Sequence, residues 1–166
     1  MKDIGFRAKP ALTAALAIFI VAGATVGGAW IFQAFGVAPC ELCLNERLPY
    51  YAGIVVSALA IGFALRGQRT LLKASFVALF LIFATGAALG AYHAGVEWHF
   101  WPGPADCTGT FKKAGSAAEF LKQLQTVKVV RCDEVALRIM GLSLAGWNAV
   151  ISVALAGWAG FGLRGK

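Results

Sequence analysis

Four long apolar runs constrain this chain more than any other feature of its sequence. Each run exceeds the ~17 residues that carry an α-helix across ~30 Å of hydrocarbon at ~1.5 Å per residue. Of the 166 residues, 59% are hydrophobic and 14% are charged, whereas soluble domains average about 25% charged residues. A soluble core in so short a chain cannot bury this much apolar surface. We therefore predict an all-α membrane protein with one domain over residues 1–166, a four-helix bundle with spans at residues 11–35, 48–65, 74–94 and 139–163.

The first run also invites comparison with a cleaved signal peptide. Basic residues Lys2, Arg7 and Lys9 precede it, as they would in a signal peptide. The run is longer than the ~7–15 apolar residues of a signal. Pro39, directly before Cys40, disfavours cleavage as a lipoprotein. We expect an uncleaved membrane helix.

The charges predict how the spans are oriented. The net charge of +7 does not indicate a nucleic-acid partner, because the basic residues lie at the ends of apolar runs and form no stripe. Both termini and the loop after the second span hold eight basic residues and one acidic residue. The loops at residues 36–47 and 95–138 hold seven of each. By the positive-inside rule, the termini are cytoplasmic and these two loops, with all four cysteines, are periplasmic.

One segment of the second periplasmic loop has a helical pattern. Ser116-Ala-Ala-Glu119 has the form of a capping box, and Phe120, Leu124 and Val127 follow at helical spacing. The pattern predicts a short amphipathic helix. It lies either on the membrane surface or against the top of the bundle.

Cys40-Glu-Leu-Cys43 is a CxxC motif directly before the second span. This spacing permits an easily reduced disulfide. It also fits half a zinc site, but Cys107 and Cys132 form no second CxxC that would complete one. A purely structural disulfide that closes so short a loop would restrict the unfolded chain very little. We therefore predict a redox-active pair and no metal.

Cys107 and Cys132 form the second pair of cysteines. Alone, they would be interpreted as a structural disulfide that stabilises its loop by about 3 kcal/mol. Beside a CxxC motif they have a second interpretation, because a thiolate of one pair can attack a disulfide of the other. Gly103, Gly109 and Gly115 would give the loop the freedom such exchange needs.

Four polar residues near the predicted spans are further candidates. Arg47 either favours a nearby thiolate and hydrogen-bonds a quinone carbonyl, or snorkels to the interface. His93 either serves a quinone as a donor of a hydrogen bond or proton, or is satisfied by backbone. Glu46 pairs with Arg47 or caps a helix. Asn148, within the fourth span, is expected to join helices by hydrogen bonds.

Together these residues resemble the disulfide bond formation protein B (DsbB) family of bacterial inner-membrane thiol oxidoreductases. The resemblance covers nearly the whole chain, including the four spans and the placement of both cysteine pairs. It rests on four segments: Cys40-Glu-Leu-Cys43-Leu-Asn-Glu-Arg47-Leu-Pro-Tyr-Tyr, Tyr92-His93-Ala-Gly-Val-Glu97, Trp101-Pro-Gly-Pro-Ala-Asp-Cys107 and Arg131-Cys132-Asp-Glu.

The resemblance implies a mechanism and its participants. A reduced periplasmic thioredoxin-fold oxidase (DsbA-like) attacks Cys107 and displaces Cys132, and the resulting thiols reduce the Cys40–Cys43 disulfide. Cys43 then matches the cysteine that engages ubiquinone or menaquinone, with Arg47 beside the quinone. His93 matches a histidine near the quinone pocket.

Two other functions remain as alternatives. One is a vitamin K epoxide reductase-like protein, in which the CxxC motif lies near the last span of the core. Here the motif precedes the second span, which favours the DsbB-like function. The other is a non-enzymatic tetraspan protein whose loops are held by stable disulfides.

Overall fold

A computed structural model describes residues 4–104, 116–118 and 131–164, with side chains from Pro10 onward. Four of its helical segments are long and apolar enough to cross a membrane. This confirms the predicted all-α membrane fold. The elements are α1 (Ile4–Ala34), α2 (Glu41–Asn45), α3 (Arg47–Leu65), α4 (Arg69–Glu97), β1 (Arg138–Ile139), β2 (Leu142–Ser143) and α6 (Leu144–Arg164).

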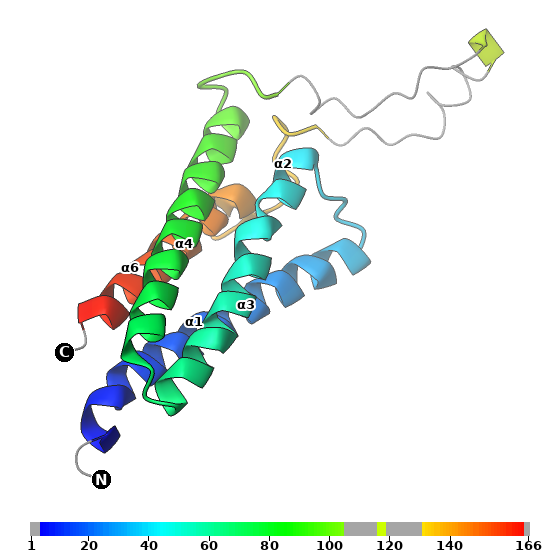
Figure 1. The fold of residues 1–166 in the computed structure, drawn as a ribbon. Helices are drawn as coiled ribbons and strands as arrows, with labels where there is room; N and C mark the ends of the chain where they lie inside the picture. The colour runs from blue at the N-terminus through cyan, green and yellow to red at the C-terminus, as the bar shows by residue number, and fades with distance from the viewer. Residues whose placement is uncertain (1–3, 105–115, 119–130, 165–166) are drawn as a thin grey trace.

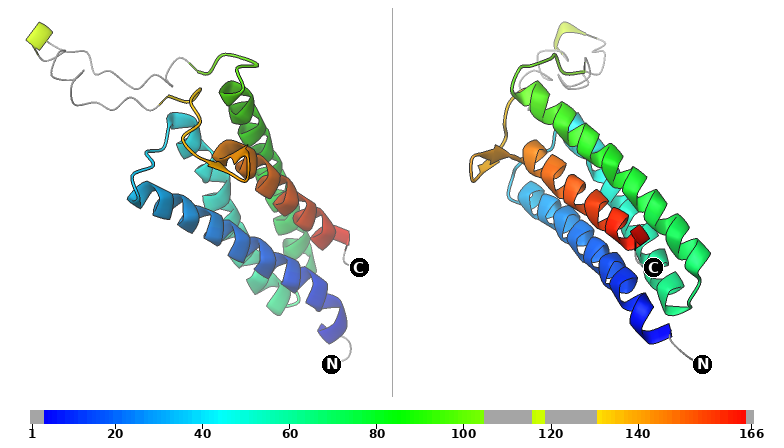
Figure 2. Two further views of the ribbon diagram at one scale, coloured as in Figure 1. Left: turned by 180° about the vertical axis from the view of Figure 1, so that it is seen from behind. Right: turned by 90° about the vertical axis from the view of Figure 1, so that its left-hand side faces the viewer.

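The four long helices lie side by side as one bundle (Figures 1 and 2). α4 packs against α3 and α6, and α1 packs against the same two neighbours. α2 caps one end of the bundle, and both termini are directed away from that end (Figure 1). The segments around the CxxC motif therefore gather at the end opposite the termini.

The interior of the bundle is largely apolar, and so is its outer face. Phe76 and Phe83 of α4 are fully buried, as are Ile18 of α1 and Leu155 of α6. Large apolar side chains on the outer face are more than half exposed, among them Ile20, Val55, Leu81 and Val153. Lipid accepts such side chains at no cost, so this outer face is the one that a bilayer requires.

Two glycines of α4 allow α6 to approach closely. A Cβ atom at Gly90 would lie 2.7 Å from the backbone nitrogen of Ala149, and one at Gly86 would lie 3.1 Å from Oγ of Ser152. A Cβ atom at the similarly spaced Gly23 or Gly27 of α1 would meet nothing within 4 Å. Of the two pairs, only the one on α4 mediates close helix packing among the described residues.

The second span begins earlier than the sequence suggested. Cys40 is the N-cap of α2, and a break at Glu46 separates α2 from α3. Pro49 is the third residue of α3, where its missing N–H has no helical acceptor to lose. The second span thus runs from Glu41 to Leu65 and includes Cys43 of the CxxC motif in its first turn.

The fourth span begins later than predicted, at Leu144 instead of Ile139. Residues 138–143 form a small antiparallel hairpin, in which Ile139 pairs with Leu142. The two residues between them, Met140 and Gly141, have φ values of 53° and 85°, the left-handed conformation that two-residue hairpins require. The predicted helix after Ser116 lies outside the described residues, except for helical Ala117 and Ala118.

We predict that Gly90→Ala lowers the free energy of unfolding by about 1–3 kcal/mol, the usual effect of overpacking. The added methyl group would meet the backbone of Ala149, which cannot rotate away. Gly23→Ala is the matched control, since open space surrounds this exposed position, and it should be neutral or stabilising by up to about 1 kcal/mol, because alanine favours a helix. Unfolding in mixed micelles with an increasing fraction of denaturing detergent measures the stability of both variants. Equal stabilities of the two variants would contradict the close packing of α4 on α6.

Candidate functional site

The CxxC motif places its two sulfur atoms side by side. Sγ of Cys40 accepts a hydrogen bond from the backbone N–H of Cys43 at 3.3 Å, as an N-cap side chain does. Sγ of Cys43 lies 2.9 Å from Sγ of Cys40, and both residues are free thiols in the structure. Cys40 is buried and Cys43 is partly exposed. The local helix start thus produces the contact that a dithiol–disulfide cycle needs.

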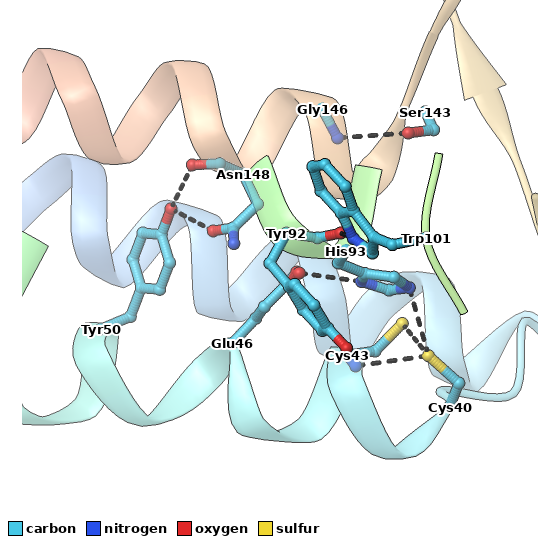
Figure 3. A network of polar contacts seen from close by, with 10 residues as sticks. All are labelled: Cys40, Cys43, Glu46, Tyr50, Tyr92, His93, Trp101, Ser143, Gly146 and Asn148. Atoms are coloured by element: carbon cyan, nitrogen blue, oxygen red, sulfur yellow. Dashed lines mark hydrogen bonds and ion pairs between the residues drawn. The ribbon is translucent and has the colours of Figure 1, made fainter. Parts of the chain in front are cut away.

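A buried histidine–carboxylate pair adjoins the thiols (Figure 3). Nε2 of His93, from α4, lies 3.7 Å from Sγ of Cys40. Nδ1 of the same ring lies 2.8 Å from Oε1 of Glu46. His93 and Glu46 are 3% and 8% exposed, so water does not compete for these contacts. Glu46, His93, Cys40 and Cys43 therefore form one continuous polar chain.

Glu46 has a different role from the two that the sequence suggested. Its side chain makes no capping hydrogen bond at the start of α3. Its partner is His93 and not Arg47. Forty-seven positions separate Glu46 from His93 in the chain, so no local pattern could have indicated the pair. Only the packing of α4 against the α2–α3 segment brings them together.

The polar chain changes the acidity of Cys40. The hydrogen bond between the sulfurs of Cys40 and Cys43 lowers the pKa of Cys40, although burial acts in the opposite direction. The neighbouring His93 lowers the same pKa further. A thiolate is the reactive form of cysteine in disulfide exchange. These contacts favour the thiolate form of Cys40.

Cys132 lies against the CxxC motif. It is 2% exposed and belongs to a buried cluster with Cys40, Leu42 and Val96, against which Cys43 also packs. Cys132 is disulfide-bonded, and Cys107 lies outside the described residues. The fold thus brings one cysteine of the second predicted pair to the first pair.

A cavity of about 360 Å³ adjoins the thiols. The two sulfurs, Arg47 and His93 contribute to its wall, and most of the remaining lining is apolar. Small-molecule sites are typically cavities of about 300–1,000 Å³ with apolar walls and a few polar groups. The small side chains of α1 that line it leave this room: Ala24, Gly28 and Ala29.

Two polar residues of this wall could hold a flat ring with carbonyl oxygens, such as a quinone. Asn148 has a buried Nδ2 with no hydrogen-bond partner among the described residues. Nη1 of Arg47 donates to Oε1 of Gln33 at 2.9 Å, which ties α3 to α1 at the cavity wall. Both are donors, and a quinone offers only acceptors. The apolar wall and its donors fit such a molecule.

Asn148 also joins two helices, as the sequence predicted. The Tyr50 hydroxyl of α3 lies 2.6 Å from Oδ1 of Asn148 on α6 and donates to it. Oγ of Ser152 lies 3.0 Å from the same hydroxyl. The sequence indicated no functional role for Tyr50, because a tyrosine near a span end is typical of an interfacial anchor. Tyr50 instead belongs to the lining of the cavity.

Cys40, Cys43 and His93 also form a possible metal-ligand set. Their ligand atoms all lie within 4.8 Å of one another. The sequence showed two of these ligands and gave no reason to place the third beside them. Thiolate sulfur and imidazole nitrogen are both ligands that zinc accepts.

We predict that Tyr50→Phe destabilises the protein by about 1–3 kcal/mol, because Oδ1 of Asn148 is left buried without its donor. Tyr51→Phe is the matched control at the next position. Among the described residues, the Tyr51 hydroxyl accepts a single 3.3 Å hydrogen bond, from exposed Trp30, so its loss should have an effect of less than about 0.5 kcal/mol. Denaturation in mixed micelles provides the comparison, and a Tyr50→Phe protein as stable as the control would contradict this role.

Comparison with known proteins points in the same direction as the site. The model of the family "Disulfide bond formation protein DsbB" matches residues 11–162. The chain is 30% identical over 141 residues to disulfide bond formation protein B of Marinobacter nauticus, covering 81% of this chain and 80% of that one. It is 25% identical over 162 residues to the protein of the same name from Polaromonas sp., covering 91% and 89%. It is 26% identical over 123 residues to uncharacterized protein RP370 of Rickettsia prowazekii, covering 73% and 69%. No solved structure matches.

Proposed function

Because the chain belongs to the DsbB family of disulfide bond formation proteins, we propose that it is a thiol:quinone oxidoreductase. It reoxidises a DsbA-like thioredoxin-fold oxidase and passes the electrons to ubiquinone or menaquinone. The observation that carries this proposal is the Cys40–Cys43 pair, which lines an apolar cavity and packs against Cys132. Family membership favours this function over the vitamin K epoxide reductase-like and structural alternatives.

The proposed location is the inner membrane of a bacterium, with the termini in the cytoplasm and the cysteines on the periplasmic side. The excess of basic residues at the termini and after the second span supports this orientation. The arrangement of the bundle agrees with it, since α2 lies at the end from which both termini point away (Figure 2). A periplasm that is kept oxidising needs a continuous outlet for electrons, and a membrane quinone provides one.

The first half of the cycle is disulfide exchange. A thiolate of the partner attacks Sγ of Cys107, the Cys107–Cys132 bond breaks, and Cys132 leaves as a thiolate. The partner's second thiol then releases Cys107, so that the partner holds a disulfide and this chain holds two thiols. Cys132 next attacks Sγ of Cys40, with which it shares a buried cluster, and Cys43 leaves as a thiolate. Cys107 completes the exchange by attacking Cys132, which restores their disulfide and leaves Cys40 and Cys43 reduced.

The second half returns the CxxC motif to its disulfide. A quinone substrate accepts two electrons and two protons and leaves as a quinol. Cys40 and Cys43 supply the electrons when their sulfurs bond to each other. The 3.7 Å contact with Cys40 lets His93 take a proton from the sulfur pair, and Glu46 holds the ring in place for that transfer. Arg47 offers its guanidinium N–H groups at the cavity wall.

We predict that Cys43→Ser abolishes quinone reduction, because no disulfide can re-form with Cys40. Cys107→Ser should block oxidation of the partner yet retain quinone binding, since Cys107 acts only in the disulfide-exchange half of the cycle. Mixing purified protein, a reduced thioredoxin-fold oxidase and a soluble quinone analogue, and following quinone absorbance, tests both. Full turnover in either variant would refute the assigned role.

We further predict that Arg47→Ala raises the apparent KM for quinone roughly tenfold to hundredfold, as expected for loss of a hydrogen bond from a charged donor. The turnover number should change less. Gln33→Ala is the control for the structural part of this effect, since it removes the partner of Arg47 but leaves the guanidinium. Arg66→Ala, at the other end of α3, controls for loss of a positive charge. Unchanged quinone kinetics in Arg47→Ala would mean that Arg47 only snorkels.

A further inference from the structure

We propose that the dithiol form of this protein is also a binding site for a thiophilic divalent metal ion such as Zn²⁺, with Cys40, Cys43 and His93 as ligands. The disulfide form lacks this site, because the thiolate is the form of cysteine that binds metal. The sequence alone indicated no metal, since it placed only the two cysteines together. The fold adds His93 from α4.

The distances between the donor atoms are close to those of a tetrahedral site. Zinc bonds of about 2.3 Å to sulfur and about 2.0–2.1 Å to nitrogen place neighbouring ligands roughly 3.5–3.8 Å apart. Sγ of Cys40 and Nε2 of His93 already lie 3.7 Å apart. The sulfurs of Cys40 and Cys43, at 2.9 Å, must separate by less than about 1 Å to reach that spacing. Cys43 is the less buried of the two cysteines, so its side chain is the one that would move.

Glu46 contacts the ring nitrogen of His93 that faces away from the sulfurs. A metal-binding histidine almost always donates its other ring N–H to a carboxylate or carbonyl, which fixes the ring and its tautomer. Oε1 of Glu46 lies 2.8 Å from Nδ1 of His93, and both side chains are buried. This contact directs the lone pair of Nε2 toward the sulfurs.

The cavity supplies the fourth position. Cys40, Cys43 and His93 all line it, so a water molecule or a small ligand can complete the coordination. Three protein ligands and one open position distinguish such a site from a closed structural zinc site. Binding exchanges two protons of the thiol–imidazole group for one divalent ion, and no electrons move. Two thiolates and Zn²⁺ together are neutral, which suits a buried location.

The site has a consequence for the reaction, and this consequence alone rests on the proposed function. Sulfur atoms that are bound to a metal ion cannot bond to each other. The metal ion therefore holds the protein in its reduced form and prevents the return of electrons to quinone. Oxidation of the pair removes both thiolate ligands, so the metal ion and the disulfide exclude each other.

The test uses the full chain in detergent with Cys107 and Cys132 both replaced by serine, so that no other cysteine contributes. Co²⁺ serves as the probe, because cobalt–thiolate bonds absorb in the near ultraviolet and tetrahedral Co²⁺ absorbs visible light. We expect one Co²⁺ per chain after reduction, displacement by Zn²⁺, and no thiolate band when Cys40 and Cys43 form a disulfide. Equal Co²⁺ binding by the oxidised and reduced proteins would overturn the proposal.

Substitutions test each ligand separately. Cys43→Ser should remove half of the thiolate absorbance and most of the affinity, and His93→Asn should also abolish tight binding. Glu46→Gln should weaken Co²⁺ binding about 10–100-fold, the usual effect of changing a group behind a metal ligand. His99→Asn is the control and should bind normally. Undiminished binding in His93→Asn, with helicity retained by circular dichroism, would reduce the site to two cysteines and refute the proposed set.

Metal binding and quinone reduction are measured independently. Co²⁺ titration needs neither quinone nor partner, and quinone reduction is assayed with a chelator present. A protein that reduces quinone but binds no Co²⁺ refutes only the metal site. A protein that binds Co²⁺ but reduces no quinone refutes the proposed function and leaves the site intact. Inhibition of quinone reduction by Zn²⁺, reversed by chelator, is the result expected when both hold.

Discussion

The contact between Glu46 and His93 is the interaction on which the site depends. It joins the α2–α3 segment to α4 over 2.8 Å, with both side chains buried. A buried carboxylate without such a partner would be costly, because removing charge from water is opposed by its loss of hydration. The pair therefore holds the imidazole ring in one orientation, and the ring in turn contacts Cys40. Loss of Glu46 would free the imidazole ring. Loss of either residue would leave the other side chain buried without its partner.

The location of this pair also suits the two reactants of the proposed function, a protein partner in water and a quinone in lipid. α2 lies at one end of the bundle (Figure 1), where Cys40 can pack against Cys132 from the long loop. On their other side the thiols line a cavity between α1, α3 and α6 whose walls are largely apolar. Tyr50 and Asn148, joined by a 2.6 Å hydrogen bond, belong to this lining. The sulfur pair thus lies between the long loop and an apolar cavity, as the proposed function requires.

The spans could be predicted from sequence because a bilayer imposes length and apolarity on every helix that crosses it. Their ends could not be predicted as well, because local turn chemistry decides them. Met140-Gly141 forms a hairpin turn, so α6 begins later than predicted.

Cys40 and Cys43 are adjacent through local helix geometry, so the motif alone indicated their contact. The pairing of Glu46 with His93 depends on how two distant helices pack, and no spacing in the sequence encodes it. The two similarly spaced glycine pairs also show that spacing alone does not determine packing. Gly86 and Gly90 face a neighbouring helix, whereas Gly23 and Gly27 do not.

The features that suit Cys40 and Cys43 to electron transfer are also those that suit them to a metal ion. Disulfide exchange requires a stabilised thiolate, and a buried histidine beside it helps to move a proton. A thiolate pair with an oriented imidazole is equally a good ligand set for a soft cation. In the proposed cycle, each reduction of the pair is followed by oxidation by quinone, so the dithiol form is short-lived while quinone is plentiful. The proposed metal site would then be open chiefly when quinone is scarce. The supply of oxidant would decide whether the cycle continues or a metal ion holds the reduced protein.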